Sequence, residues 1–151
     1  MKTRAKRFGP FWDGVEGRAP IPRAAATLGF QFIEADVERG TIEVAFTATE
    51  EFTNPKGNVL GAFLDAMLYD TVGPALLATL NPDQFQSTLD FTVRFLRPVR
   101  PGRIVGKGRV VHRDADIAYV EAALHDSNGA TIAVATATAK VIPLAIAKDA
   151  V

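Results

Sequence analysis

Apolar and polar residues alternate in several separate segments of the chain, and this alternation predicts strands. Residues 28–36 (LGFQFIEAD) and 41–49 (TIEVAFTAT) alternate on either side of a turn sequence at 38–40, so we expect a β-hairpin there. The alternation returns at 87–96 (STLDFTVRFL), with one apolar face formed by Leu89, Phe91, Val93 and Phe95. Residues 103–113, 117–125 and 130–143 are predicted as further strands, separated by turn sequences at 114–116 and 126–129.

Residues 59–79 are the one strong helical candidate. Their apolar residues fall on every side of a helix: Val59, Leu60, Phe63, Leu64, Met67, Leu68, Val72, Leu76 and Leu77. A helix that is apolar all round is buried, and a sheet curled around it would bury it. The order of hairpin, lone helix and about four consecutive strands therefore predicts the α+β class with an antiparallel sheet.

Length and charge narrow the class of protein. The 151 residues suit a single domain, in which we expect a flexible basic arm over 1–9 (Lys2, Arg4, Lys6 and Arg7), a short helix with an irregular segment over 10–27, and the core over 28–143. Lysine plus arginine and aspartate plus glutamate both number 17, so the formal net charge is zero. Proteins that bind a nucleic-acid backbone normally carry a positive excess, and we expect no nucleic-acid partner.

The expected cellular compartment is inferred from the cysteine content, the basic start of the sequence and the longest apolar stretch. There are no cysteines, which excludes disulfides and thiolate metal sites and is consistent with a reducing compartment. The basic start is not followed by the apolar segment of a signal peptide. Asp65, Asp70, Gly73 and Pro74 interrupt the longest apolar stretch, so no membrane span is predicted. We therefore expect a cytoplasmic protein.

Two carboxylates lie inside the predicted apolar helix. Burying an ionised carboxylate is costly, so each must be paired, solvated in a pocket, or raised in pKa. Helical geometry places Asp65 and Tyr69 about 40° apart around the axis, and Asp70 about 140° from Asp65. One carboxylate can then face a site while the other faces a structural partner. The structural alternative is that each Asp only bonds a neighbouring backbone amide or arginine.

The start of this helix offers a second chemical feature. Helix N-termini carry free N–H groups and a positive dipole end, which suit a developing oxyanion. In NPKGNVLGAF, Gly57 and Gly61 permit a ligand to approach the backbone closely. An oxyanion-binding helix end followed by a carboxylate one to three turns later is typical of water-driven acyl transfer.

The segment NPKGNVLGAFLDAMLYDTVGPALL, followed by STLDFTVRFLRPVRPG, resembles the hotdog-fold acyl-CoA thioesterases of the PaaI-like (phenylacetate-pathway) type. Their pattern is N-P-x-G-x-V-(H/Q)-G-G-x(6)-D and then a strand ending in F-L-R-P-x-x-x-G. The resemblance extends over about residues 10–143. It implies a six-stranded antiparallel sheet wrapped around one long central helix, in a homodimer or tetramer with active sites at the dimer interface. It also implies a helix carboxylate that activates water or attacks the thioester carbonyl.

Residue by residue, the resemblance assigns roles to three positions. Asn54 matches the family asparagine, which positions the reacting groups, and Gly61 matches the first glycine, whose N–H polarises the carbonyl. Thr88 falls where some relatives place a Ser or Thr that orients water from the partner subunit.

The chain departs from the family pattern at three positions. Leu60 replaces His or Gln, Ala62 replaces the second glycine, and Tyr69 stands where the catalytic carboxylate belongs. We therefore take Asp65, one turn earlier, as the general base or nucleophile, and Asp70 as the second choice. Pocket shape is expected to depend on Leu60, Phe63, Met67 and Tyr69.

Two other groups of side chains bear on the chemistry. Arg94, Arg97, Arg100 and Arg103 form either a solvated rim or a site for coenzyme A phosphates, chiefly through Arg97 and Arg100. His112 and His125 do not have metal-ligand spacing, and the aspartates at 114 and 116 suit a turn, so we expect no metal site. A hotdog dehydratase or hydratase would need a histidine near the helix, where none occurs.

The sequence thus predicts an acyl-CoA thioesterase that needs no metal or other cofactor beyond the coenzyme A of its substrate. The alternative is an acyl-CoA or fatty-acyl binding protein of the same fold, in which Tyr69 marks a lost catalytic position. Turnover distinguishes the two.

Overall fold

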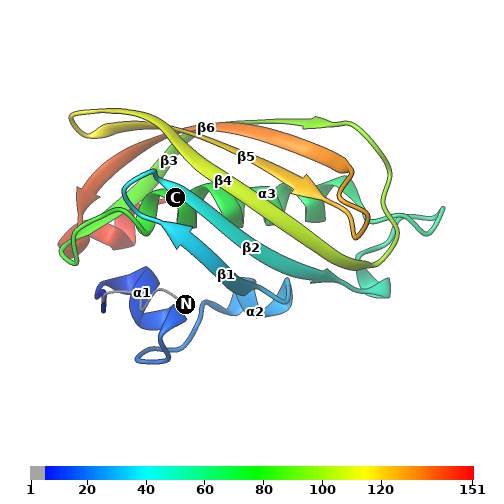
Figure 1. The fold of residues 1–151 in the computed structure, drawn as a ribbon, viewed down its shortest axis with the longest axis horizontal. Coiled ribbons are helices and arrows are strands. Elements are labelled where there is room, and N and C mark those ends of the chain that lie inside the picture. Colours follow the sequence, from blue (N-terminus) through cyan, green and yellow to red (C-terminus); the bar gives the residue numbers. More distant parts are fainter. Residues whose placement is uncertain (1–5) are drawn as a thin grey trace.

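The computed structural model describes residues 6–151. Six strands and three α-helices follow in this order: α1 (Pro10–Val15), α2 (Arg23–Thr27), β1 (Gln31–Asp36), β2 (Thr41–Ala48), α3 (Gly61–Leu77), β3 (Gln84–Phe95), β4 (Gly102–Asp114), β5 (Ile117–His125) and β6 (Thr131–Pro143). Short 3-10 turns lie at Glu50–Phe52 and Leu144–Asp149. Figure 1 shows the sheet curving around α3, with α1 and α2 beside the β1 edge.

All neighbouring strands of the sheet are antiparallel, in the order β1-β2-β4-β5-β6-β3. The predicted α+β fold, a six-stranded antiparallel sheet wrapped around one long central helix, is confirmed. The predicted strand over 28–36 is shorter at its start because Leu28 and Gly29 end α2. The N–H of Phe30 bonds the Ala25 carbonyl, and Gly29 adopts a left-handed φ of 68°, which together form a Schellman motif.

Small residues on the inner face of the sheet let α3 lie close to it. A Cβ on Gly106 would be 2.5 Å from Oγ1 of Thr71, and one on Gly108 would be 3.1 Å from Cβ of Ala75. Buried alanines continue this face across β5 and β6: Ala118, Ala122, Ala133, Ala135, Ala137 and Ala139. The apolar sides of α3 therefore form the centre of the core, with Met67 and Leu68 fully buried.

The N-terminal segment packs against one end of the core. The indole N–H of Trp12 donates to the Ala78 carbonyl at 3.0 Å, which ties α1 to the end of α3. Phe11, Trp12 and Phe32 form edge-to-face contacts beside this bond. Of the expected basic arm, Lys2 and Arg4 lie outside the described residues.

Strand β3 stands at one border of the sheet, paired with β6 on one side only. On its other side the chain end makes two contacts: the N–H of Thr88 donates to the Val151 carbonyl, and the N–H of Val151 donates to Oγ of Ser87. Leu89 and Phe95 on this strand are more than half exposed. Among residues 6–151, no helix has the length and apolar character needed to cross a membrane.

Candidate active site

The loop before α3 is closed by hydrogen bonds that leave the first N–H groups of the helix without a partner in the described residues. Oδ1 of Asn54 accepts the N–H groups of Lys56 (2.9 Å) and Asn58 (3.1 Å), as an Asx turn does. The N–H of Leu60 donates to the Phe52 carbonyl at 2.8 Å. Among the described residues, the N–H groups of Gly61 and Ala62 have no partner. The first turn of α3 therefore offers two free donors at its positive end.

One stripe of α3 faces strand β3. A Cβ on Gly61 would be 3.1 Å from Cζ of Phe95, the ring of Tyr69 meets Phe91 edge-on at 5.3 Å, and a Cβ on Gly73 would be 3.4 Å from Nε2 of Gln86. These three helix residues are separated by four or eight positions, so β3 runs alongside α3 in the opposite direction.

Asp65 occupies this stripe between Gly61 and Tyr69. It lies one helical turn, about 6 Å of axial rise, beyond the free N–H of Gly61. Its Oδ1 atom is buried and has no hydrogen-bond partner among the described residues. Desolvation by burial raises the pKa of Asp65 above its ordinary value of 3.8. The Asp65 carboxylate can therefore accept a proton, and no described side chain forms a hydrogen bond with its Oδ1.

Tyr69 also carries an unsatisfied polar atom. Its hydroxyl oxygen is buried and without a hydrogen-bond partner in the described chain. A buried hydroxyl normally has a partner, because leaving it without one costs about 1–3 kcal/mol. The stripe therefore has two polar atoms, on Asp65 and Tyr69, that can bond a substrate or water.

Asp70 lies on another side of the helix, as its spacing predicts. Its Oδ2 is buried without a partner in the described residues. Burial raises the pKa of Asp70 to about 7 from 3.8. The structure does not bring Asp70 to the Gly61–Asp65 stripe.

Two apolar residues expected to shape the pocket have different environments. Phe63 stacks on Phe52, with ring centroids 4.2 Å apart and planes 8° apart. Leu60 is 43% exposed, just before the first turn of α3. Phe63 is therefore held by the chain itself, whereas Leu60 is open to a ligand or a second subunit.

Thr88 is not brought to Asp65 within one chain. It lies on β3 between Gln86, which contacts Gly73, and Phe91, which contacts Tyr69. Its hydroxyl lies 3.4 Å from Oε1 of Gln86. Any contact between Thr88 and a reacting group at Asp65 would have to come from a partner subunit.

The four arginines at the end of β3, in the following turn and at the start of β4 have different environments. The Arg100 guanidinium donates to the Lys56 carbonyl at 3.0 Å, and Arg103 donates to Oε1 of Gln31 at 3.0 Å. Arg94 and Arg97 are exposed. The expected rim is therefore partly engaged in contacts within the chain.

Two contacts at the site have no signal in the sequence pattern. Phe95 covers the Cα of Gly61, and Arg100 covers Gly57, so the space that each glycine opens is filled by a side chain of the same chain. Each pair is separated by more than thirty residues in the sequence. The alternation in 87–96 indicated that Phe91 and Phe95 share a face, but no local pattern indicated which helix residues they meet.

The chain is similar to thioesterases in sequence and in fold. The sequence model of the thioesterase superfamily matches residues 57–133. The phenylacetic acid degradation-related protein of Ralstonia eutropha JMP134 is 37% identical with a TM-score of 0.83, and the match covers 86% of this chain and 98% of that one. A Haemophilus influenzae thioesterase shares the fold at 19% identity with a TM-score of 0.78, covering 92% of this chain and 94% of that chain.

The PaaI protein of the E. coli phenylacetic acid degradation operon has the same fold, with a TM-score of 0.77 at 19% identity over 87% of this chain and 93% of that chain. The sheet curled around α3 agrees with these matches. The chain therefore belongs to the thioesterase superfamily, a family of thioester hydrolases, as a PaaI-like hotdog protein.

Proposed function

We propose that this protein hydrolyses acyl-coenzyme A thioesters with Asp65 as its catalytic carboxylate. The observation that carries the proposal is the buried, unpartnered Oδ1 of Asp65, one turn beyond the free N–H of Gly61. A carbonyl bound at that N–H would lie within a helical turn of a carboxylate. This is the arrangement that acyl transfer to water requires.

In the proposed reaction, the thioester oxygen accepts a hydrogen bond from the Gly61 N–H. Asp65 accepts a proton from a water molecule as the water oxygen bonds to the carbonyl carbon. The C–S bond then breaks, the coenzyme A sulfur takes up the proton that Asp65 accepted, and a carboxylic acid is released. Direct attack by the Asp65 carboxylate, followed by hydrolysis of the anhydride, uses the same atoms and gives the same products. Neither route needs a metal or a redox cofactor.

The proposed role of Asn54 is to shape the helix start. Its Oδ1 accepts two backbone N–H groups of the loop, so its effect on the reacting groups passes through the loop backbone and through its own amide N–H₂. Ala62, whose N–H is also without a partner in the described residues, offers a second donor beside Gly61.

We expect the working enzyme to be a homodimer, or a tetramer built from dimers. Two hollows on the described chain, of about 1600 Å³ and about 460 Å³, are not lined by any residue of α3. Apolar side chains beside the stripe are partly uncovered within one chain, since Leu60 is 43% exposed and Leu89 and Phe95 are more than half exposed. A second copy packed against β3, beyond the contacts of Val151, would cover them and bring a partner's Thr88 to the site.

Arg97 is the proposed contact for coenzyme A phosphate, since its exposed guanidinium has no hydrogen-bond or ion-pair partner among the described residues. Tyr69 and Leu60 would contact the acyl part. A cytoplasmic location stays a prediction, which fits the supply of acyl-coenzyme A.

A binding protein without turnover is the second candidate, and Tyr69 in place of the family carboxylate favours it. The test is thiol release from short, long and aromatic acyl-coenzyme A substrates, followed with a thiol-reactive dye. The cysteine-free protein gives no background. Release that is saturable and abolished in Asp65→Asn supports the enzyme. Calorimetric binding of the same substrates without any release would support the binding protein and overturn the proposal.

A further inference from the structure

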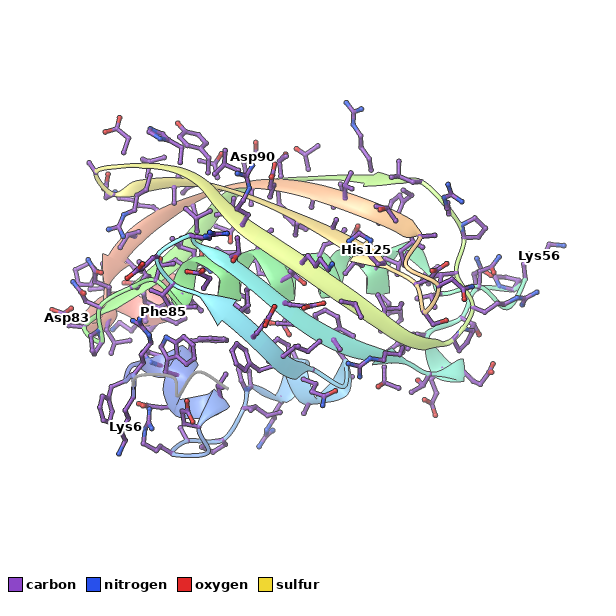
Figure 2. The ribbon with its side chains drawn as sticks, viewed as in Figure 1. Lys6, Lys56, Asp83, Phe85, Asp90 and His125 are labelled. Atoms are coloured by element: carbon purple, nitrogen blue, oxygen red, sulfur yellow. The ribbon has the colours of Figure 1, made fainter. Side chains whose placement is uncertain are left out.

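Arg100 holds the loop that leads into α3. Its Nη1 atom donates to the Lys56 carbonyl at 3.0 Å, at the tip of the loop where Figure 2 shows Lys56 at the end of the molecule. The guanidinium lies over Gly57: a Cβ at Gly57 would overlap Nη1 and would be 3.6 Å from Cζ. Gly57 has a left-handed φ of 82°. The left-handed backbone conformation favours a glycine here, and the Arg100 guanidinium lies in the space next to it.

A second bond joins the same two segments. The N–H of Val59 donates to the Val99 carbonyl at 2.8 Å, next to Arg100 in the chain. Inside the loop, the N–H of Asn54 donates to the Asn58 carbonyl at 2.7 Å, and the N–H of Gly57 donates to the Asn54 carbonyl at 2.9 Å. The loop is therefore closed from within by Asn54 and attached from outside at residues 99 and 100.

The attachment ends immediately before the free donors. Val59 and Leu60 both use their N–H groups in bonds to other segments, and Gly61 is the first residue whose N–H has no partner in the described chain. The Gly61 N–H shares one rigid peptide plane with the Leu60 carbonyl, and the bonds at Lys56, Val59 and Leu60 restrict the backbone that leads into that plane. Among the residues that the structure describes, the bond from Arg100 to the Lys56 carbonyl is the one hydrogen bond to this loop from a side chain outside it.

We propose that Arg100 is a positioning residue that fixes the oxyanion-binding N–H of Gly61 through the 54–60 loop. The inference rests on the proposed function, since it assigns Arg100 to the same site. It differs from the role expected from the arginine cluster, in which Arg100 binds a phosphate of coenzyme A. The positioning role acts on the acyl-transfer step, whereas the phosphate-binding role acts on the affinity for the coenzyme A part of the substrate.

The two roles predict different kinetics for Arg100→Ala. If Arg100 binds a phosphate at the rim, its removal raises KM for an acyl-coenzyme A and leaves a truncated thioester, such as an acyl-N-acetylcysteamine, unchanged. If Arg100 holds the oxyanion donor in place, its removal lowers kcat, by about tenfold or more, on both substrates. Arg100→Lys retains a cation and one donor for the Lys56 carbonyl, so it recovers part of kcat.

Arg113→Ala is the matched control. Arg113 is also exposed and also donates to one backbone carbonyl, that of Ala115, at 3.2 Å in the turn between β4 and β5. Its removal is expected to leave kcat and KM unchanged on both thioesters. Thermal unfolding of all variants shows whether a decrease in activity reflects unfolding of the protein.

Amide hydrogen exchange tests the attachment without requiring turnover. In Arg100→Ala the peptides covering 54–61 should exchange faster than in the parent, while those of β5 and β6 should not; Arg113→Ala should leave 54–61 unchanged. Unchanged exchange over 54–61 in Arg100→Ala, or a full kcat on both thioesters, would overturn the inference. A parent protein without thiol release would overturn the proposed function, and the exchange result would still decide whether Arg100 holds the loop.

Discussion

Asp65 and Tyr69 lie one turn apart on the same stripe of α3, and each has a buried oxygen atom without a hydrogen-bond partner in the described residues. This stripe faces β3, because Phe95 contacts Gly61 at one end of it and Phe91 contacts Tyr69 further along. In the family pattern the carboxylate belongs at 69, and here it is found at 65. The helix thus retains a carboxylate on the same side, moved about 6 Å towards the Gly61 N–H.

A carboxylate placed at position 69 should restore activity to a protein that has lost the carboxylate of Asp65. Asp65→Ala is expected to abolish most thiol release, and Asp65→Ala/Tyr69→Asp to regain at least about tenfold of it, because a general base typically contributes two to four orders of magnitude. The matched control is Asp65→Ala/Tyr69→Asn, which has the same shape without the charge. Equal rates for the two double variants would show that position 69 cannot serve as the base.

The pH dependence of turnover should report Asp65. The carboxyl must be ionised to accept a proton, and burial raises its pKa above 3.8, so kcat/KM should fall with acidification at a pH above that ordinary value. The measurement is the pH profile of kcat/KM on one thioester. The same acidic limb should persist in Asp70→Asn, and its disappearance there would assign the titration to Asp70 instead.

Asp70 should make the fold less stable as pH rises. Its folded pKa of about 7 exceeds 3.8, so the folded protein holds the proton more tightly than the unfolded chain does. Stability is then full below about pH 4 and is lost as pH rises through 7. Urea titrations at about pH 5 and about pH 8 measure this. The free energy of unfolding of Asp70→Asn, taken relative to the parent, should be about 3 kcal/mol higher at the higher pH than at the lower one. A difference that does not change with pH would contradict the buried, unpaired carboxyl.

Because α3 packs closely on β4, replacing Gly108 with a larger residue should destabilise the fold. A Cβ there would meet Cβ of Ala75, the Thr71 carbonyl oxygen and Cγ2 of Ile42 at 3.1–3.2 Å. Gly108→Ala is therefore expected to cost about 1–3 kcal/mol of the free energy of unfolding, measured by urea titration. The control is Gly14→Ala in α1, whose Cβ would come no closer than 3.9 Å to Ile21. A neutral Gly108→Ala would mean that helix and sheet are further apart.

The fold was predictable because its signals are local. Alternation within single strands and an apolar helix at 59–79 sufficed for the class, and strand β5 begins and ends where the pattern predicts. The start of β3 lies three residues before the predicted one, because Gln84 and Phe85 extend the strand by pairing with Pro143 and Ile142. Long-range pairing of this kind leaves no periodic trace in either segment.

The site was predictable only in part. The stripe of Gly61, Asp65 and Tyr69 follows from helical spacing alone. The ring of Phe95 on Gly61 and the guanidinium of Arg100 on Gly57 do not, because these contacts join β3 and the turn after it to the start of α3. The sequence indicated arginines suited to phosphate, and only the folded chain shows one of them bonded to the loop.

The most direct test of the central claim compares Asp65→Asn with Asp70→Asn in steady-state hydrolysis of an acyl-coenzyme A. Both changes remove one carboxylate from α3 and retain its shape, but only Asp65 lies on the stripe with the Gly61 N–H. We predict that kcat falls by about a hundredfold or more in Asp65→Asn and stays within about threefold of the parent in Asp70→Asn. An Asp65→Asn protein as active as its parent would contradict the account.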